Sequence, residues 1–334
     1  MKPPKHPPLR GASRRKPVLV AALDATSPED FRRLPGADRF RIVATVAPDR
    51  DWLAEQLPLA DAHLASLRVP LTEDLITSAG RLKVVATNTT GTDHLDTQAL
   101  RKHGIELLSL KNDLQFLRTV TATAELAFAL LLASARRLRE CSESTRRGTW
   151  ARHQLAGPQL KGKTLGVVGY GRLGKMVAGY GRAFGMHILA ADPRKQRFPR
   201  HVECVSLSQL LRKSDFVSLH VHLRDETRHL LGPKEFRVIK PGAILVNTSR
   251  GGLIDEAALR SAMQSGRVAA AGLDVIDGEW LEDKRRHPLI AYSRTNPRLL
   301  ITPHVGGTCP ESIRASIAHT VEKLARHFEG STQG

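Results

Sequence analysis

Cysteine is scarce in this chain. Only Cys141, Cys204 and Cys309 occur among the 334 residues, and no two of them form a CxxC pair. This usage excludes a disulfide scaffold and a zinc site built from cysteines, and it favours a reducing compartment. We therefore expect a cytoplasmic protein.

Long apolar runs and aromatic side chains are also lacking. The longest apolar candidate, Leu126 to Ala135, is half of the ~20 residues that a membrane span needs, so it predicts a buried helix and no membrane partner. Aromatic residues make up 4% of the chain, and few stand among the basic ones. A nucleic-acid groove is therefore not expected. One basic cluster instead indicates a solvated face or a subunit contact: Arg136, Arg137, Arg139, Arg146 and Arg147.

Basic residues outnumber acidic ones, 51 to 33, for a formal charge of +18. Residues 1–16 hold six lysines and arginines and four prolines but no acid. Such a segment buries too little apolar surface to order itself and predicts a disordered basic tail. It lacks the apolar core of a secretory signal, and its prolines oppose the amphipathic helix of a mitochondrial transit peptide. The positive charge outside this segment would attract anions such as phosphates and carboxylates, or would serve solubility alone.

After the tail, short apolar runs alternate with helical patterns, which indicates parallel strands joined by crossover helices. The helix expected over Thr121 to Leu138 separates two series of runs, and an amphipathic helix carries Ile313, Ile317, Val321, Leu324 and Phe328 on one face. We predict an α/β protein with two doubly wound parallel sheets. The expected strands are 18–22, 41–44, 84–86, 105–108, 164–168, 188–191, 216–220, 243–247, 270–275 and 299–302.

A glycine-rich turn follows the strand at 164–168. Gly169, Gly171 and Gly174 form a GxGxxG pattern that opens a helix and includes Arg172 and Leu173. These glycines allow a tight turn, a close backbone approach to a pyrophosphate and close packing of helix on strand. The pattern predicts dinucleotide binding.

An acidic residue, Asp192, stands at the end of the next strand. A carboxylate there accepts hydrogen bonds from the adenosine ribose and repels a 2′-phosphate, which favours NAD over NADP. Arg194 and Lys195 follow closely and weaken that repulsion.

Three ionisable residues follow strands of the second series: Arg250, Glu279 and His304. The carboxyl ends of parallel strands are where doubly wound folds bind ligands. A guanidinium can hold a carboxylate and polarise a neighbouring carbonyl. An imidazolium can protonate that carbonyl oxygen while a hydride reaches carbon, and a carboxylate beside it fixes the ring. His220 and His222 alternate on one strand without a third ligand, so no metal is predicted.

At these residues the sequence resembles the D-isomer-specific 2-hydroxyacid dehydrogenases, over nearly the whole chain after the tail. The resemblance also rests on the segments 91–96, 121–125, 247–251, 272–275 and 302–304. It implies a Rossmann dinucleotide-binding domain at 118–305, inserted in a flavodoxin-like substrate domain at 17–117 and 306–334. It further implies an NAD-dependent enzyme that interconverts a 2-keto acid and a D-2-hydroxy acid, and a homodimer.

The resemblance also implies roles for single residues. Arg250 would bind substrate, and Glu279 would pair with His304, the acid/base and second substrate contact. Thr248 and Asp274 would contact the cofactor, Asp274 at the nicotinamide carboxamide. Backbone N–H groups of Thr89, Thr90 and Gly91 would bind the substrate carboxylate.

The chain departs from the family pattern at three places. Trp280 and His222 replace prolines, and Trp280 is expected to reshape the site entrance. Only 30 residues follow His304, so no regulatory domain of the kind found in some phosphoglycerate dehydrogenases is expected. The alternative function is an NAD-binding regulator or corepressor on the same fold, for which the basic tail would be suited. The sequence does not select one hydroxy acid.

Overall fold

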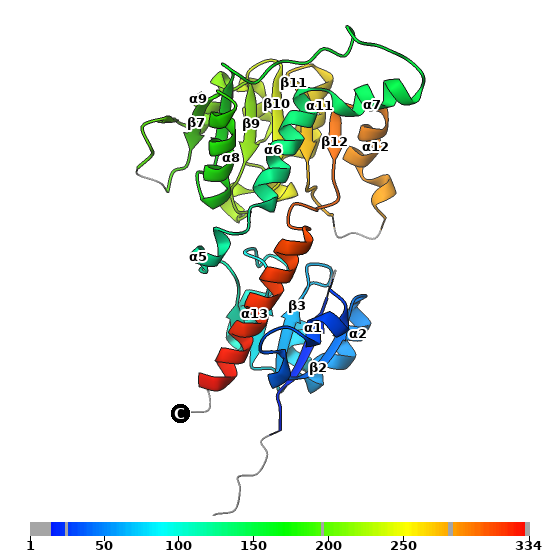
Figure 1. Cartoon of the computed structure of the whole chain (residues 1–334), viewed down its shortest axis with the longest axis vertical. Helices are drawn as coiled ribbons and strands as arrows, with labels where there is room; N and C mark the ends of the chain where they lie inside the picture. The colour runs from blue at the N-terminus through cyan, green and yellow to red at the C-terminus, as the bar shows by residue number, and fades with distance from the viewer. Residues whose placement is uncertain (1–14, 24–25, 195–196, 280–282, 331–334) are drawn as a thin grey trace, which may run out of the picture. The chain divides into compact units, whose positions relative to one another are not determined.

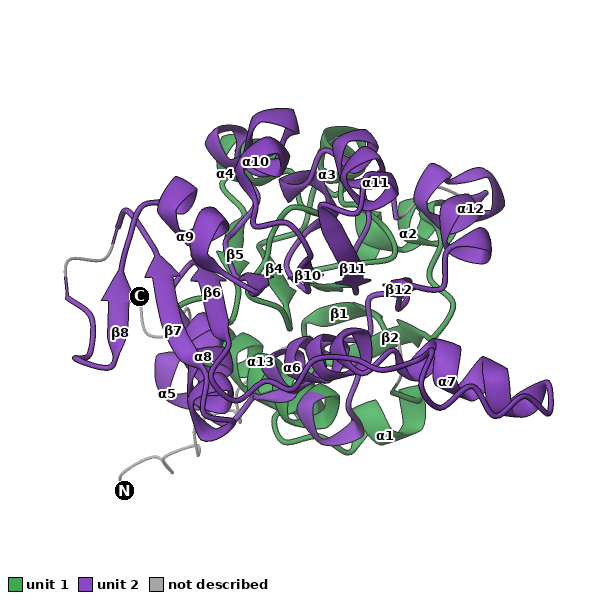
Figure 2. Ribbon diagram, turned by 90° about the horizontal axis from the view of Figure 1, so that it is seen from above, with its two compact units in different colours: residues 1–113, 313–334 green, residues 114–312 purple. Residues whose placement is uncertain are grey.

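The computed structural model describes residues 15–23, 26–194, 197–279 and 283–330. Within it the chain forms two compact units, each described here by itself (Figure 2). Unit 1 comprises residues 1–113 and 313–334, and unit 2 comprises residues 114–312. Most of the predicted tail, Lys195 and Trp280 lie outside the described residues.

Unit 1 is built on a five-stranded parallel sheet of order β2-β1-β3-β4-β5. This 2-1-3-4-5 order is the flavodoxin-like one. Its strands are β1 (Val18–Ala22), β2 (Arg41–Thr45), β3 (Ala62–Ala65), β4 (Val84–Thr87) and β5 (Glu106–Leu108). Its helices are α1 (Pro28–Arg32), α2 (Arg50–Gln56), α3 (Glu73–Ser78), α4 (Thr97–Lys102) and α13 (Pro310–Gly330), the red helix of Figure 1.

The C-terminal helix α13 completes the core of unit 1. Ile317, Val321 and Leu324 are buried and share a cluster with Leu19 and Phe31. The amphipathic face predicted from the sequence is the face that packs. Each such aliphatic side chain contributes about 1.5–3 kcal/mol when it leaves water.

Unit 2 is built on a seven-stranded parallel sheet of order β12-β11-β10-β9-β6-β7-β8. From β8 to β11 the strands follow the 3-2-1-4-5-6 order of a Rossmann fold, and β12 adds a seventh strand beside β11. This order confirms the predicted fold class. Its strands are β6 (Thr164–Val168), β7 (His187–Ala191), β8 (Val202–Cys204), β9 (Phe216–Leu219), β10 (Ala243–Asn247), β11 (Val268–Leu273) and β12 (Leu299–Ile301). Its helices are α5 (Leu114–Leu117), α6 (Ala122–Ala135), α7 (Leu138–Arg146), α8 (Arg172–Ala183), α9 (Leu207–Lys213), α10 (Pro233–Val238), α11 (Glu256–Gln264) and α12 (Pro288–Thr295).

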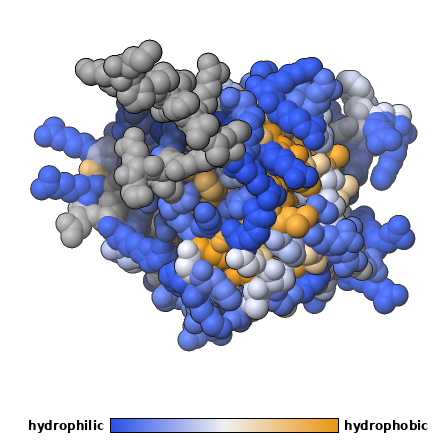
Figure 3. All heavy atoms as spheres, turned by 90° about the horizontal axis from the view of Figure 1, so that it is seen from below, coloured by the Kyte–Doolittle hydropathy of each residue, from blue (hydrophilic) through white to orange (hydrophobic). Residues whose placement is uncertain are grey.

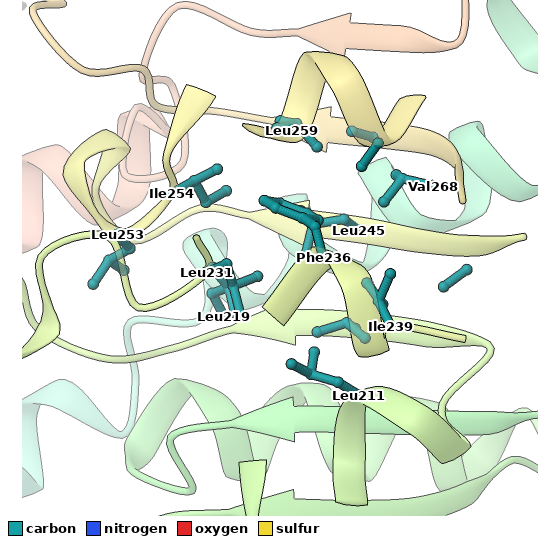
Figure 4. Packing of buried hydrophobic residues seen from close by; sticks show 14 of the residues in the cluster. Leu211, Leu219, Leu231, Phe236, Ile239, Leu245, Leu253, Ile254, Leu259 and Val268 are labelled. Atoms are coloured by element: carbon teal, nitrogen blue, oxygen red, sulfur yellow. The ribbon is translucent and has the colours of Figure 1, made fainter. Parts of the chain in front are cut away.

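Apolar side chains fill both faces of the unit 2 sheet. On one face, Leu219 and Leu245 from the strands meet Phe236 and Leu259 from α10 and α11 (Figure 4). On the other face, α6 and α8 cover the strands. A sheet buried on both faces leaves its strand ends as the place for polar chemistry.

The long helix expected over 121–138 is two helices. α6 ends at Ala135, and Arg137 adopts a left-handed conformation (φ 51°) before α7 begins. Gly157 packs against this end, since a Cβ there would lie 2.0 Å from the carbonyl oxygen of Ala135. The segment Leu114–Ala135, which comprises α5 and α6, is long and apolar enough to cross a membrane. In unit 2 the buried residues of α6 instead pack on β10 and β11.

The limits of unit 2 differ by a few residues from those expected from the sequence. α5 belongs to unit 2, and the guanidinium of Arg172 donates hydrogen bonds to the carbonyls of Leu117, the last residue of α5, and of Val120. Residues 306–312 also belong to unit 2, where the backbone N–H of Gly306 donates to Asp274 (2.8 Å). These contacts fix both connecting segments to unit 2.

Figure 3 shows one face of the molecule, most of whose described surface is hydrophilic. Two apolar side chains on and just after α7 are exposed: Leu138, at the start of the helix, is 53% exposed, and Trp150, four residues after its end, is 84% exposed. No residue of α7 is buried, and the helix lies at the periphery of unit 2 (Figures 1 and 2).

Candidate active site

The glycine turn after β6 is shaped by close backbone packing. Gly169 has φ +87°, a conformation that favours glycine. A Cβ on Gly174 would lie 2.1 Å from the carbonyl oxygen of Gly169, so only glycine lets α8 approach the turn this closely. These two glycines hold the helix N-terminus against the carboxyl end of β6.

Gly171 has a different environment. A Cβ built there meets nothing within 4 Å, so the space beside its backbone is open. Gly171 is the N-cap of α8, and no side chain caps that helix end. The first N–H groups of a twelve-residue helix therefore face an open space, the arrangement that binds a diphosphate. Leu173 packs against the core and keeps this first turn in place.

Asp192 follows β7 and braces the turn. Its Oδ2 accepts a hydrogen bond from the backbone N–H of Tyr170 (3.0 Å), and its Oδ1 accepts one from the N–H of Arg194 (3.1 Å). The carboxylate is thereby fixed beside the glycine turn, where each oxygen retains a further lone pair for a hydroxyl group.

The side chain of Arg172 makes its hydrogen bonds outside the glycine turn. Its guanidinium binds the carbonyls of Leu117 and Val120, and burial lowers its pKa. This contact anchors the segment between α5 and α6, a role that the glycine pattern did not predict. The backbone N–H of Arg172 remains part of the open helix end.

The loop after β10 carries Thr248 and Arg250. Buried Asn247 shapes it: its amide donates to the carbonyl of Arg250 (2.9 Å) and its Oδ1 accepts the N–H of Ser249 (2.9 Å). The hydroxyl of Ser249 donates to the carbonyl of Leu219 on the neighbouring strand (2.8 Å). Arg250, half-buried, donates through Nη1 to the carbonyl of Ser249 (2.8 Å).

Two buried hydroxyl or ring atoms near this edge of the sheet have no hydrogen-bond partner in the described part of the chain. One is Oγ1 of Thr248, and the other is Nδ1 of His220 at the end of β9. Burial lowers the pKa of His220 to about 4, so its ring is neutral near pH 7. Together with the open space at Gly171, an unpartnered Thr248 fits a site that takes up a polar ligand.

Asp274, at the end of β11, holds the segment that carries His304. Its Oδ1 accepts hydrogen bonds from the hydroxyl of Thr302 (2.6 Å) and the N–H of Val305 (2.9 Å). Its Oδ2 accepts the N–H of Gly306 (2.8 Å). Burial raises the pKa of Asp274, and these hydrogen bonds act in the opposite direction.

His304 and Glu279 form a pair. Nδ1 of the imidazole lies 2.7 Å from Oε1 of Glu279, and both side chains are largely buried, with 20% and 15% exposed. His304 has φ +54°, in the left-handed region that non-glycine residues adopt at a cost of about 1–2 kcal/mol. Residues held in such conformations concentrate at functional sites.

The loop over Thr89, Thr90 and Gly91 belongs to unit 1 and follows β4. The hydroxyl of Thr89 bonds to that of Thr87 (2.9 Å) and donates to the carbonyl of Gly91 (2.8 Å). Within the described residues, the backbone N–H groups of Thr90 and Gly91 donate to no protein group. Two consecutive N–H groups of this kind suit an anion.

Sequence reasoning missed the residues that hold the loops in place: Asn247, Ser249 and Thr302. All three residues lie inside the quoted motifs, yet only their contacts distinguish them from the neighbouring side chains. No group of three metal-ligand residues occurs among the residues that the structure describes.

The arrangement in unit 2 suits a redox reaction on a polar carbonyl. β10, β11 and β12 are adjacent and parallel, so Arg250, Glu279 and His304 follow strands that end at one edge of the sheet. The glycine turn follows β6 at the same edge. A guanidinium, a paired imidazole and an open glycine turn therefore belong to one sheet edge.

Comparison with known proteins gives the same picture. Residues 128–306 match the family model of the D-isomer specific 2-hydroxyacid dehydrogenase NAD binding domain. The hydroxypyruvate reductase of Thermotoga maritima is 37% identical over 280 residues, which cover 84% of this chain and 89% of that one. The glyoxylate reductase of Thermococcus litoralis is 37% identical over 287 residues, 83% of each chain.

Solved structures agree. The D-lactate dehydrogenase of Aquifex aeolicus, crystallised with NAD and lactic acid, has a TM-score of 0.82 at 26% identity and covers 95% of this chain and 96% of that one. The family model, the 37%-identical relatives and the shared architecture establish the family. The chain belongs to the D-isomer-specific 2-hydroxyacid dehydrogenases and is an NAD-dependent oxidoreductase.

Proposed function

We propose that this enzyme reduces a small 2-keto acid to its D-2-hydroxy acid, or the reverse, with Arg250, Glu279 and His304 as its catalytic residues. The observation that carries the proposal is the 2.7 Å pair of His304 and Glu279 at the sheet edge that also holds Arg250. The two relatives at 37% identity are named for hydroxypyruvate and glyoxylate. These two acids are therefore the first substrates to test.

The residues of the glycine turn would hold NADH, which when bound would supply the hydride for the carbonyl carbon. The N–H groups at Gly171, Arg172, Leu173 and the helix end would hold the diphosphate, and Asp192 would accept hydrogen bonds from the adenosine ribose. The buried hydroxyl of Thr248 is available to the nicotinamide half. Asp274, which fixes residues 302–306 through three hydrogen bonds, would contact the carboxamide.

Arg250 holds the substrate carboxylate and polarises the adjacent carbonyl through two N–H groups of its planar fork. In unit 1, the N–H groups of Thr90 and Gly91, in the loop that Thr89 braces, are the groups proposed to bind a substrate carboxylate. Nε2 of His304 gives its proton to the carbonyl oxygen as the carbon gains the hydride, which yields the hydroxyl group. Glu279 keeps the ring in place through Nδ1.

The direct test is a panel of 2-keto acids, including hydroxypyruvate, glyoxylate and pyruvate, assayed with NADH and NADPH. Consumption of NADH with at least one acid supports the enzyme. NADH binding without turnover on any acid would favour the alternative of an NAD-binding regulator.

The coenzyme preference is expected to rest on the charge of Asp192. We predict that Asp192→Asn lowers the ratio of kcat/KM with NADH to kcat/KM with NADPH by roughly tenfold, the effect of removing about 1.4 kcal/mol of repulsion. Asparagine keeps an oxygen to accept the N–H of Tyr170, so the turn is retained. Asp192→Ala, which loses that bond, should shift the same ratio and also weaken NADH binding. A wild type that already uses NADPH better than NADH would show that Asp192 does not set the preference.

The dimer and the cytoplasmic location are also proposals. Trp150 and Leu138 are exposed apolar side chains around α7, and their cover by a second copy of the chain would bury them. Light scattering should give twice the 36.7 kDa mass, and Trp150→Glu should give the monomer. A dimer unaffected by Trp150→Glu would place the interface elsewhere.

The three cysteines are free thiols, as a reducing cytoplasm favours.

A further inference from the structure

In the loop that leads from β11 to Glu279, two side chains form hydrogen bonds with the backbone of Asp277. The backbone N–H of Asp277 donates to Oε1 of Glu256 (2.8 Å), and its carbonyl accepts a hydrogen bond from Nε2 of His287 (2.9 Å). Glu256 begins α11, and His287 is the N-cap of α12. Side chains from two helices thus hold both polar groups of one residue in the loop, two positions before Glu279.

The two gripping side chains also contact each other. Nε2 of His287 lies 3.3 Å from Oε2 of Glu256, and they are only 11% and 17% exposed. The N–H of Leu289 donates to Nδ1 of His287 (3.3 Å), which assigns the proton of a neutral ring to Nε2. Burial raises the pKa of Glu256, while the hydrogen bond from Asp277 and the contact with His287 act against that rise.

The loop that carries Arg250 packs against the same stretch of backbone. A Cβ on Gly251 would lie 2.0 Å from the carbonyl carbon of Ile276 and 2.2 Å from the nitrogen of Asp277. The Arg250 loop therefore packs against the peptide bond between Ile276 and Asp277. Glu256 accepts the N–H of this peptide, and His287 donates to the carbonyl of Asp277, which belongs to the next peptide. After it, Gly278 turns the chain with φ +71° and Glu279 reaches His304.

We propose that Glu256 and His287 form a clamp on Asp277 that positions Glu279 against His304. They are positioning residues, because they act through the backbone and touch no reacting atom. The inference rests on the proposed roles of Glu279 and His304. Without the clamp, Gly278 would let the loop end move, and Glu279 would hold the imidazole in its reactive orientation for less of the time.

The chain offers variants that separate the clamp from the helix cap. His287→Gln places a side-chain N–H where Nε2 stood, which keeps the clamp but gives up the acceptor at Nδ1. His287→Asn keeps an N-cap oxygen for Leu289 but is too short to reach the carbonyl of Asp277. A role in capping α12 alone would make Asn the better replacement, whereas the clamp makes Gln the better one.

The experiment measures kcat and KM with NADH and hydroxypyruvate or glyoxylate, NADH affinity by fluorescence, and Tm. We expect His287→Asn and Glu256→Ala to lower kcat roughly 10- to 100-fold, the usual effect of a misplaced catalytic group. NADH affinity should change less than about threefold, because the glycine turn keeps its own contacts. His287→Gln should keep kcat within about threefold of the wild type.

Asp215→Ala is the matched control. Asp215 also accepts a backbone N–H, that of Thr164 (2.9 Å), and also has a basic partner, Lys240 (2.7 Å). It precedes β9, so it lies at the edge of the sheet opposite to the site. Asp215→Ala should lower Tm yet leave kcat within about threefold of the wild type.

Two results would overturn the clamp. One is a wild-type kcat in His287→Asn, which carries the test even where Glu256→Ala fails to fold. The other is an equal fall of kcat in Asp215→Ala. His304→Ala in the same assay separates this inference from the proposed function. If His304→Ala is inactive while the clamp variants are fully active, only the clamp is contradicted. If His304→Ala is active, the acid/base role of His304 is itself contradicted.

Discussion

His304→Ala is expected to lower kcat for keto-acid reduction by roughly 10²- to 10⁴-fold, the range for loss of a positioned general acid. The imidazole, held through Nδ1 by Glu279 at 2.7 Å, supplies the proton that completes the hydroxyl group. NADH affinity should hardly change, because the glycine turn at Gly169–Gly174 is held by its own contacts, among them the hydrogen bond from the N–H of Tyr170 to Asp192. Steady-state rates and an NADH fluorescence titration measure the two effects separately.

A second histidine gives the control. Nδ1 of His327 lies 2.9 Å from Oε2 of Glu106, and this histidine–glutamate pair belongs to unit 1, whereas His304 and Glu279 belong to unit 2. His327→Ala should therefore keep kcat within about twofold of the wild type while losing a similar ion pair. Turnover in His304→Ala near that of His327→Ala would contradict the assignment of the acid.

Arg250→Lys is expected to be severe although it keeps the charge. A guanidinium donates two parallel hydrogen bonds across a carboxylate and its adjacent carbonyl, whereas an ammonium is a single point charge. Loss of one charge-assisted hydrogen bond, about 1.5–3 kcal/mol, predicts a fall in kcat/KM for the keto acid of roughly 10- to 100-fold. The shape of the loop should survive, since Asn247 binds the backbone carbonyl of Arg250 and not its side chain.

The control for this substitution is Arg267→Lys. Arg267 also donates its guanidinium to backbone carbonyls, those of Arg237 (2.6 Å) and Ile239 (3.3 Å), but it precedes β11 at the opposite edge. Its variant should lower Tm and leave kcat/KM unchanged. If Arg250→Lys weakens NADH binding while kcat/KM for the keto acid is preserved, Arg250 belongs to the cofactor site and the mechanism must change.

Six of the seven strands of unit 2 were predictable because a sheet buried on both faces needs apolar runs, and β6 and β10 have them. β8 was missed because Val202–Cys204 is three residues long and only its first residue is buried. β3 was missed because Ala62–Ala65 is four residues long, has no β-branched residue and includes His63. That histidine is nevertheless buried at the centre of the sheet, where its Nδ1 bonds the carbonyl of Val20 (2.9 Å). Neither composition nor period reveals such a pairing across 43 residues.

The same limit applies at the candidate site. Glycine spacing and strand ends pointed to the turn and to Arg250, Glu279 and His304, because those signals are local. The hydrogen bonds to the backbone of Asp277 come from Glu256, 21 positions before it, and His287, 10 positions after it. Contacts of that kind depend on the tertiary fold, so the sequence alone did not single these residues out.

The return of α13 to the first sheet has a consequence for synthesis on the ribosome. Unit 2 is one continuous segment, residues 114–312, so all its residues are synthesised before those of α13 that complete unit 1. Leu19 and Phe31 are therefore made long before their packing partners Val321 and Leu324. Until these partners have been made, the apolar surface around Leu19 and Phe31 lacks part of its cover and offers chaperones a binding surface.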